Sequence, residues 1–135
     1  MKFRNDERTT VQHVENCTLE VTHTSGGDGE IEMETRGRVP MQWAKLGTIR
    51  AIDVPIGTIE YGVTVRSQVH RVVWDTLNEF PRAISILVDG RLQEGSERAS
   101  RVWMIVDSQD GADRVARALR DLAYLCGAQE HSDPY

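Results

Sequence analysis

The sequence predicts a single α+β domain, mainly an antiparallel β-sandwich or barrel of about seven strands with one amphipathic helix at its C-terminal end. The chain has 135 residues, which is room for one domain and enough to bury a core. Short runs of alternating apolar and polar residues recur along most of the chain, as in strands with one solvent-exposed face. The last run is followed by a segment with the 3.6-residue period of a helix.

The first two strands are predicted to form a hairpin. Cys17, Leu19 and Val21 alternate with polar residues, and the same alternation returns over residues 31–36. Residues 25–29, Ser-Gly-Gly-Asp-Gly, separate the two runs and have the composition of a turn. We therefore expect an antiparallel pair with one face exposed to solvent.

Five further strands are predicted beyond an irregular segment at residues 39–46. They are residues 48–54, 59–65, 69–76, 84–88 and 102–106. Pro81 separates the strands at 69–76 and 84–88, and residues 92–100 are predicted to be a polar loop. The apolar residues of the stretch 65–80 also fit one face of a helix, so both structures remain open there, although the β-branched residues favour a strand.

The C-terminal segment is predicted to be a helix that begins at Asp107 or Ser108, since either side chain can cap the first N–H groups. Six residues share its apolar face: Ala112, Val115, Ala116, Leu119, Leu122 and Cys126. Gly127 is a typical residue to end it.

The domain is expected to span residues 16–127. Residues 1–15 are polar and show no clear period, so we expect a flexible N-terminal arm. Residues 128–135 follow the predicted end of the helix and are expected to form a flexible tail.

The order of seven short strands and a C-terminal helix resembles that of a pleckstrin-homology-like (PH-like) domain. The likeness is clearest at the end of the chain, where the strand at 101–106 and a short acidic cap lead into the helix at 112–127, and the opening hairpin is similar too. The resemblance implies two bent antiparallel sheets packed at an angle, a helix closing one end, and a non-catalytic binding scaffold.

The first hairpin loop departs from the phosphoinositide-binding members of this family. Those members carry Lys and Arg in and beside this loop. Here the loop contains Asp28 and is flanked by Glu20, Glu30 and Glu32. An acidic loop repels a phosphorylated headgroup, which argues against lipid binding through it.

The net charge of −5 argues against nucleic acid or an anionic membrane as the main partner. No apolar run approaches the roughly 20 residues that span a bilayer, and the charged start lacks the apolar segment of a signal peptide. Cys17 and Cys126 form neither a CxxC pair nor a cluster with His. We therefore expect a cytoplasmic protein with two buried, reduced thiols.

Motifs for common chemistries are incomplete. The glycines of residues 25–29 join two strands without a nearby Lys or a following helix, so they indicate a turn and not a phosphate-binding loop. His23, with Thr24 and Ser25, resembles one half of the paired motif of two-histidine phosphoesterases, but the second half is absent. The four histidines are scattered without metal-ligand spacing, so we expect no metal and no cofactor.

A basic cluster next to an aromatic residue is the predicted ligand or partner site: Arg66, His70, Arg71 and Trp74. Arginine beside an aromatic residue is frequent at binding hot spots. On a strand, however, Arg71 points away from the other three side chains. Asp53 interrupts an apolar strand, where an acid is either paired with another group or directed to solvent.

We expect a non-enzymatic binding module that recognises a protein segment or a second copy of itself. The predicted surface is the edge of the strand at 69–76 and the adjoining helix face, where a partner strand could pair. One alternative is a small-molecule or nucleotide-binding protein whose Arg side chains hold an anionic ligand in a pocket between protomers. Another is a small enzyme that uses Asp53 or a histidine as a base.

Overall fold

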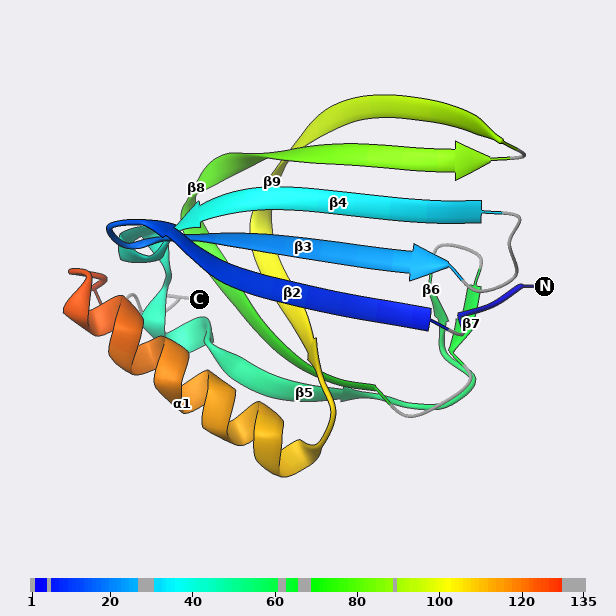
Figure 1. Cartoon of the computed structure of the whole chain (residues 1–135). Helices are drawn as coiled ribbons and strands as arrows, with labels where there is room; N and C mark the ends of the chain where they lie inside the picture. Colours follow the sequence, from blue (N-terminus) through cyan, green and yellow to red (C-terminus); the bar gives the residue numbers. More distant parts are fainter. Residues whose placement is uncertain are drawn as a thin grey trace.

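The computed structural model describes residues 2–4, 6–26, 31–60, 63–65, 69–88 and 90–129. Most of this chain forms one curled, antiparallel sheet with a single helix at its C-terminal end (Figure 1). The strands of this sheet, in spatial order, are β2 (Asp6–Glu15), β3 (Thr18–Gly26), β4 (Ile31–Pro40), β8 (Val69–Val88) and β5 (Arg50–Val54), and β9 (Arg91–Val106) also pairs with β8.

A small second sheet and three helical segments complete the fold. The sheet has the order β1 (Lys2–Arg4), β7 (Val63–Val65) and β6 (Ile59–Glu60), and its β1–β7 pair is parallel. Two 3₁₀ turns, η1 (Met41–Trp43) and η2 (Leu46–Thr48), connect β4 to β5, and α1 (Gln109–Leu125) follows β9. No helix in the described ranges is long and apolar enough to cross a membrane.

The bend in β8 and β9 gives the sheet its curl. Residues 82–88 of β8 lie between β4 and β9, whereas residues 70–73 lie between β5 and β9. The β8–β9 register shifts between Asp75 and Phe80, and such irregularities bend a strand and increase its twist. The same two strands thereby belong to both layers of a half-barrel. In Figure 1 the strands of the two layers cross each other in the view.

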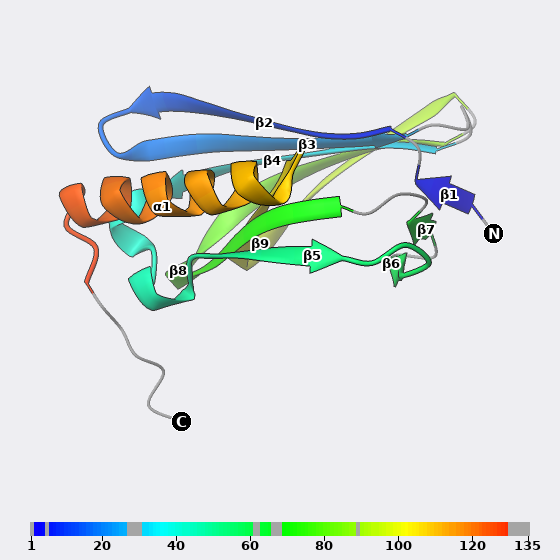
Figure 2. The same cartoon turned by 90° about the horizontal axis from the view of Figure 1, so that it is seen from below.

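The helix packs inside this curl. Figure 2 shows α1 between the layer of β2, β3 and β4 and the layer that contains β5. Its buried face consists of Ala112, Ala116, Leu119 and Ala123. The three alanines on this face are small, so the helix can approach Val72 and Trp74 of β8, which are fully buried in the core. Ser108 is the N-cap, and its side chain accepts a hydrogen bond from the Gly111 N–H at 3.0 Å.

The structure confirms the hairpin, the C-terminal helix and the extended conformation of residues 69–80. The flexible arm predicted at residues 1–15 is wrong for residues 6–15, which form β2 and pair with β3. The polar loop predicted at residues 92–100 is also wrong, because these residues belong to β9. The strands predicted on either side of Pro81 are one continuous strand, β8. Of the predicted tail, Ala128 is buried, and the end of the chain from residue 130 lies outside the described residues.

A disulfide joins the β2–β3 turn to the end of the helix. Cys17 and Cys126 are bonded, with Cα atoms 5.8 Å apart and 109 residues apart in sequence. The prediction of two reduced thiols is therefore wrong. Each cysteine by itself has the sequence context of a buried small residue. Only the packing of α1 against η1, whose Met41 N–H donates to the Cys17 carbonyl at 2.7 Å, brings them together. Disulfides persist in oxidising surroundings, so a cytoplasmic location stays a prediction.

Candidate functional site

The structure separates the residues that the sequence grouped as a site. Trp74 is fully buried in the core. His70 and Arg71 are consecutive on β8 and point to opposite faces, as the strand period predicts. Residues 70–73 have β5 on one side and β9 on the other, so both edges of the strand are already occupied there. Arg66 lies outside the described residues.

His70 pairs with Asp53 across the β5–β8 ladder. The distance between His70 Nδ1 and Asp53 Oδ1 is 2.7 Å, and the two residues are direct register partners. With its amide nitrogen turned toward the carboxylate, Gln109 donates to Asp53 Oδ1 at 2.7 Å and to Oδ2 at 3.0 Å. Asp53 thus links β8 to the start of α1. The enzyme alternative, with Asp53 or a histidine as base, stays a prediction.

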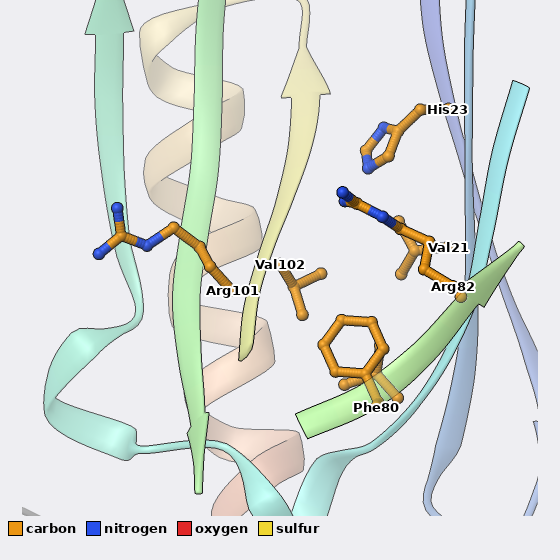
Figure 3. Close-up of a pocket in the computed structure, with 8 residues that line it drawn as sticks. Val21, His23, Phe80, Arg82, Arg101 and Val102 are labelled. Atoms are coloured by element: carbon orange, nitrogen blue, oxygen red, sulfur yellow. The ribbon is translucent and has the colours of Figure 1, made fainter. Parts of the chain in front are cut away.

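A different group of side chains converges on the inner side of the curl. The His23 ring, from β3, stacks on the Trp103 ring, from β9, with centroids 3.6 Å apart and an angle of 13° between the planes. The Arg71 guanidinium carbon lies 4.7 Å from the Trp103 ring centroid, within cation–π range. Arg82, from the second half of β8, directs its guanidinium toward His23 (Figure 3). We call His23, Arg71, Arg82 and Trp103 the inner cluster.

Hydrogen bonds fix the orientation of His23. Thr9 Oγ1 accepts the Ile105 backbone N–H at 3.0 Å and lies 3.0 Å from His23 Nδ1. A hydroxyl can accept one hydrogen bond and also donate its own proton, so the Thr9 hydroxyl donates to His23 Nδ1. The resulting chain of contacts joins β9, β2 and β3, and it holds the imidazole ring flat against Trp103.

His23 is a neutral imidazole at physiological pH. Its pKa is lowered from the usual 6.5 to about 3, first by burial and then by the positive charges of Arg82 and Arg71, while a hydrogen bond with the Trp103 backbone acts in the opposite direction. The inner cluster therefore contains two permanent guanidinium charges and no competing imidazolium.

A small cavity lies beside the inner cluster. Its volume is about 10 Å³, which is room for roughly one water molecule. It is lined by Val21, His23, Gly37, Val39, Phe80, Arg82, Arg101 and Val102. Figure 3 shows Arg101 extending away from His23, and its Nε donates to Asp75 Oδ1 at 2.8 Å, a hydrogen bond that raises the pKa of Arg101.

Arg82 has one carboxylate partner and one unsatisfied donor. A terminal nitrogen of its guanidinium contacts Glu97 Oε1, from the exposed part of β9. Its Nε is buried and has no hydrogen-bond acceptor among the described residues. The hydroxyl of Thr35 is likewise buried without a hydrogen-bond partner there, and Thr35 is the register partner of His23 on β4. An ordered water or a ligand oxygen can satisfy buried donors of this kind.

Sequence reasoning could not have found the inner cluster. His23, Arg82 and Trp103 come from three strands, and no local pattern links them. His23 was noticed only as half of a phosphoesterase motif, whereas in the structure it is a buried ring on Trp103. The one available signal was a histidine on the apolar side of a strand, in phase with Leu19 and Val21.

Comparisons of the chain with protein-family models, curated proteins and solved structures find no match. Among the described residues, no three His, Cys, Asp or Glu side chains group as metal ligands.

Proposed function

We propose that this chain is a non-enzymatic binding module that holds an anionic group, a carboxylate or a phosphate, of a small ligand at the inner cluster. The proposal keeps the binding function implied by the PH-like resemblance and places it on the curled sheet. The observation that carries it is the convergence of the Arg82 and Arg71 side chains beside a buried, neutral His23. Guanidinium groups in a poorly hydrated site bind carboxylates and phosphates through strong, directional hydrogen bonds.

The charge balance of the site supports an anionic ligand. The chain as a whole is negative, at −5, but the inner cluster contains two guanidinium groups, of which Arg82 has Glu97 as its carboxylate partner. The buried Arg82 Nε and the Thr35 hydroxyl are two donors that an anionic oxygen would satisfy. The part of β9 that carries Glu97 is exposed, so its carboxylate can leave Arg82 without opening the core.

In this proposal the Glu97 carboxylate competes with the ligand for the Arg82 guanidinium. The cavity of about 10 Å³ is too small for a phosphate or carboxylate group beside the bound Glu97 side chain. A ligand therefore takes the place of the Glu97 carboxylate on Arg82. Binding is then weaker in the natural chain than in a chain from which this carboxylate has been removed.

Titrations with inorganic phosphate and with acetate, followed by NMR at constant ionic strength, test the proposal. We expect saturable shifts at His23, Arg82 and the Trp103 indole N–H. Glu97→Gln should bind the anions several-fold more tightly, and Arg82→Gln should not bind them. Arg98→Gln is the matched control, because Arg98 is exposed and its contact is with Glu79, 3.6 Å away. If neither the natural chain nor Glu97→Gln shows saturable shifts, the cluster is a structural network and the proposal is wrong.

A further inference from the structure

The first part of β9 is a free strand edge. Over residues 91–99 this strand pairs with β8 on one side and has no strand on its other side among the described residues. In Figure 1 this part of β9 forms the outer margin of the sheet, beyond β8. Every residue from 91 to 98 is exposed, including Leu92 at 62%. An unpaired edge of this length offers backbone N–H and C=O groups to another strand.

We propose that this edge pairs antiparallel with the same edge of a second copy of the chain, forming a dimer with one continuous sheet. The partner is a second copy of the chain, because the charges along this edge are complementary when the strand pairs antiparallel with itself. This inference is independent of the anion site, since it rests on the outer edge of β9 and on its outward face.

The register of the pairing follows from the strand period and the charges. Side chains on one face of β9 alternate, so Glu94, Ser96 and Arg98 lie on the face opposite to Glu97. A two-fold axis at Ser96 places Glu94 of each copy opposite Arg98 of the other, with the two Ser96 residues facing each other. Opposite charges directly across an antiparallel pair stabilise it.

The neighbouring registers fit the charges less well. An axis at Glu94 would place Arg91 opposite Glu97, whose carboxylate already contacts Arg82, and would set the two Glu94 carboxylates against each other. Like charges directly opposite are destabilising. An axis at Gly95 would pair no opposite charges. An axis at Ser96 also uses residues 93–99, which end where the β8–β9 register shifts and the strand bends away.

Two further observations fit this register. Gly95 has open space where a side chain would lie, with no atom within 4 Å of a Cβ placed there, so the Glu97 side chain that this register sets opposite Gly95 meets no obstruction on that face. The present contact of Arg98, with Glu79, is 3.6 Å long, and both side chains are largely exposed, at 68% and 60%. An exposed pair of this kind contributes little, so Arg98 can turn to a partner at small cost.

Sedimentation equilibrium of charge variants tests the pairing. We expect a dimer for the natural chain. Glu94→Arg converts two attractive pairs into two repulsive ones and should weaken the dimer roughly tenfold. Combining it with Arg98→Glu restores two opposite-charge pairs and should restore the dimer. Arg117→Glu, on an exposed part of α1, is the control and should leave the dimer unchanged.

A cysteine scan then tests the axis. Paired residues in an antiparallel ladder have Cα atoms within disulfide range, so Ser96→Cys should cross-link two copies under mild oxidation. Gln93→Cys is the control, because the axis at Ser96 separates its two copies by about 20 Å. A natural chain that is monomeric at all concentrations, a dimer insensitive to Glu94→Arg, or equal cross-linking of both cysteine variants would each overturn the proposal. None of these outcomes depends on whether the chain binds anions.

Discussion

At the scale of single residues, His23 is held by contacts from three strands. It is only 7% exposed, it lies against Trp103 and beside two arginines, and its pKa is lowered to about 3. In the unfolded chain its pKa returns to the ordinary value near 6.5. Between these two values the unfolded chain binds a proton that the folded chain does not.

This difference predicts how stability depends on pH. Since the unfolded state binds more protons between about pH 3 and pH 6.5, the free energy of unfolding falls as the pH falls through that range. The contribution of His23 is complete above pH 6.5 and should decrease by about 2 kcal/mol between pH 6.5 and pH 5, at 1.36 kcal/mol per pH unit. Urea unfolding at pH 7 and at pH 5 measures it.

His23→Phe is the variant that isolates this contribution. A phenyl ring can still stack on Trp103 but cannot bind a proton, so the loss of stability between pH 7 and pH 5 should be smaller than in the natural chain. His13→Gln, at an exposed position of β2, should retain the full pH dependence. An identical pH dependence in His23→Phe and the natural chain would contradict the burial of a neutral imidazole.

At the scale of elements, the bent β8–β9 hairpin sets the shape of the sheet. Phe80, at the register shift in β8, is 2% exposed and packs against Gly37 of β4. A Cβ at residue 37 would lie 3.0 Å from Phe80 Cε2, which is closer than side chains normally approach. The absence of a side chain at this position therefore lets β4 lie close against Phe80 at the bend.

We expect Gly37→Ala to destabilise the fold by about 1–3 kcal/mol, because the added methyl group forces Phe80 or the strand to move. Gly95→Ala is the matched control. The new Cβ there has no atom within 4 Å, so this substitution should be near neutral or slightly stabilising through its effect on the unfolded chain. Urea denaturation measures both. Equal effects of the two substitutions would show that β4 and the bend are not in close contact.

The same elements show how far the sequence could predict the fold. The hairpin of β3 and β4 and the helix α1 were predictable because each has one apolar and one polar face, and the periods are clear. Residues 91–98 are exposed on both faces, so they carry no apolar alternation and resemble a loop. Pro81 suggested an interruption, but β8 tolerates it because Pro81 pairs with β9 alone, and the ladder to β4 ends at Arg82.

The candidate site was less predictable than the elements. Arg71 was identified from the sequence, and it does belong to the inner cluster, but its partners there are in other strands. Trp103 is the diagonal neighbour of Arg71 across the β8–β9 ladder. Arg82 joins the same cluster because β8 bends and contributes to both layers. Contacts of this kind depend on strand order, which short-range patterns do not specify.

At the scale of the whole molecule, the disulfide joins the β2–β3 turn to the end of the helix. It closes a loop of 109 residues in sequence, so it strongly restricts the unfolded chain. We expect reduction to lower the free energy of unfolding by about 2–4 kcal/mol. Urea unfolding with and without a reducing agent measures this difference.

A double variant provides the control for reduction. Cys17→Ala with Cys126→Ala should unfold like the reduced natural chain and should not respond to the reducing agent, because the sequence has no other cysteine. If reduction leaves the unfolding midpoint of the natural chain unchanged, the two cysteines are not bonded in solution.

The position of this bond also has a mechanical consequence. If the chain is pulled from a point before residue 17 and a point after residue 126, the tension passes directly through the two sulfur atoms. The sheet, the helix, the inner cluster and the free edge of β9 all lie mostly within the bypassed segment, so they carry almost no load. Under such a pull only β2 and the segments outside the bond would extend, and the rest of the domain would keep its structure until the bond itself was reduced.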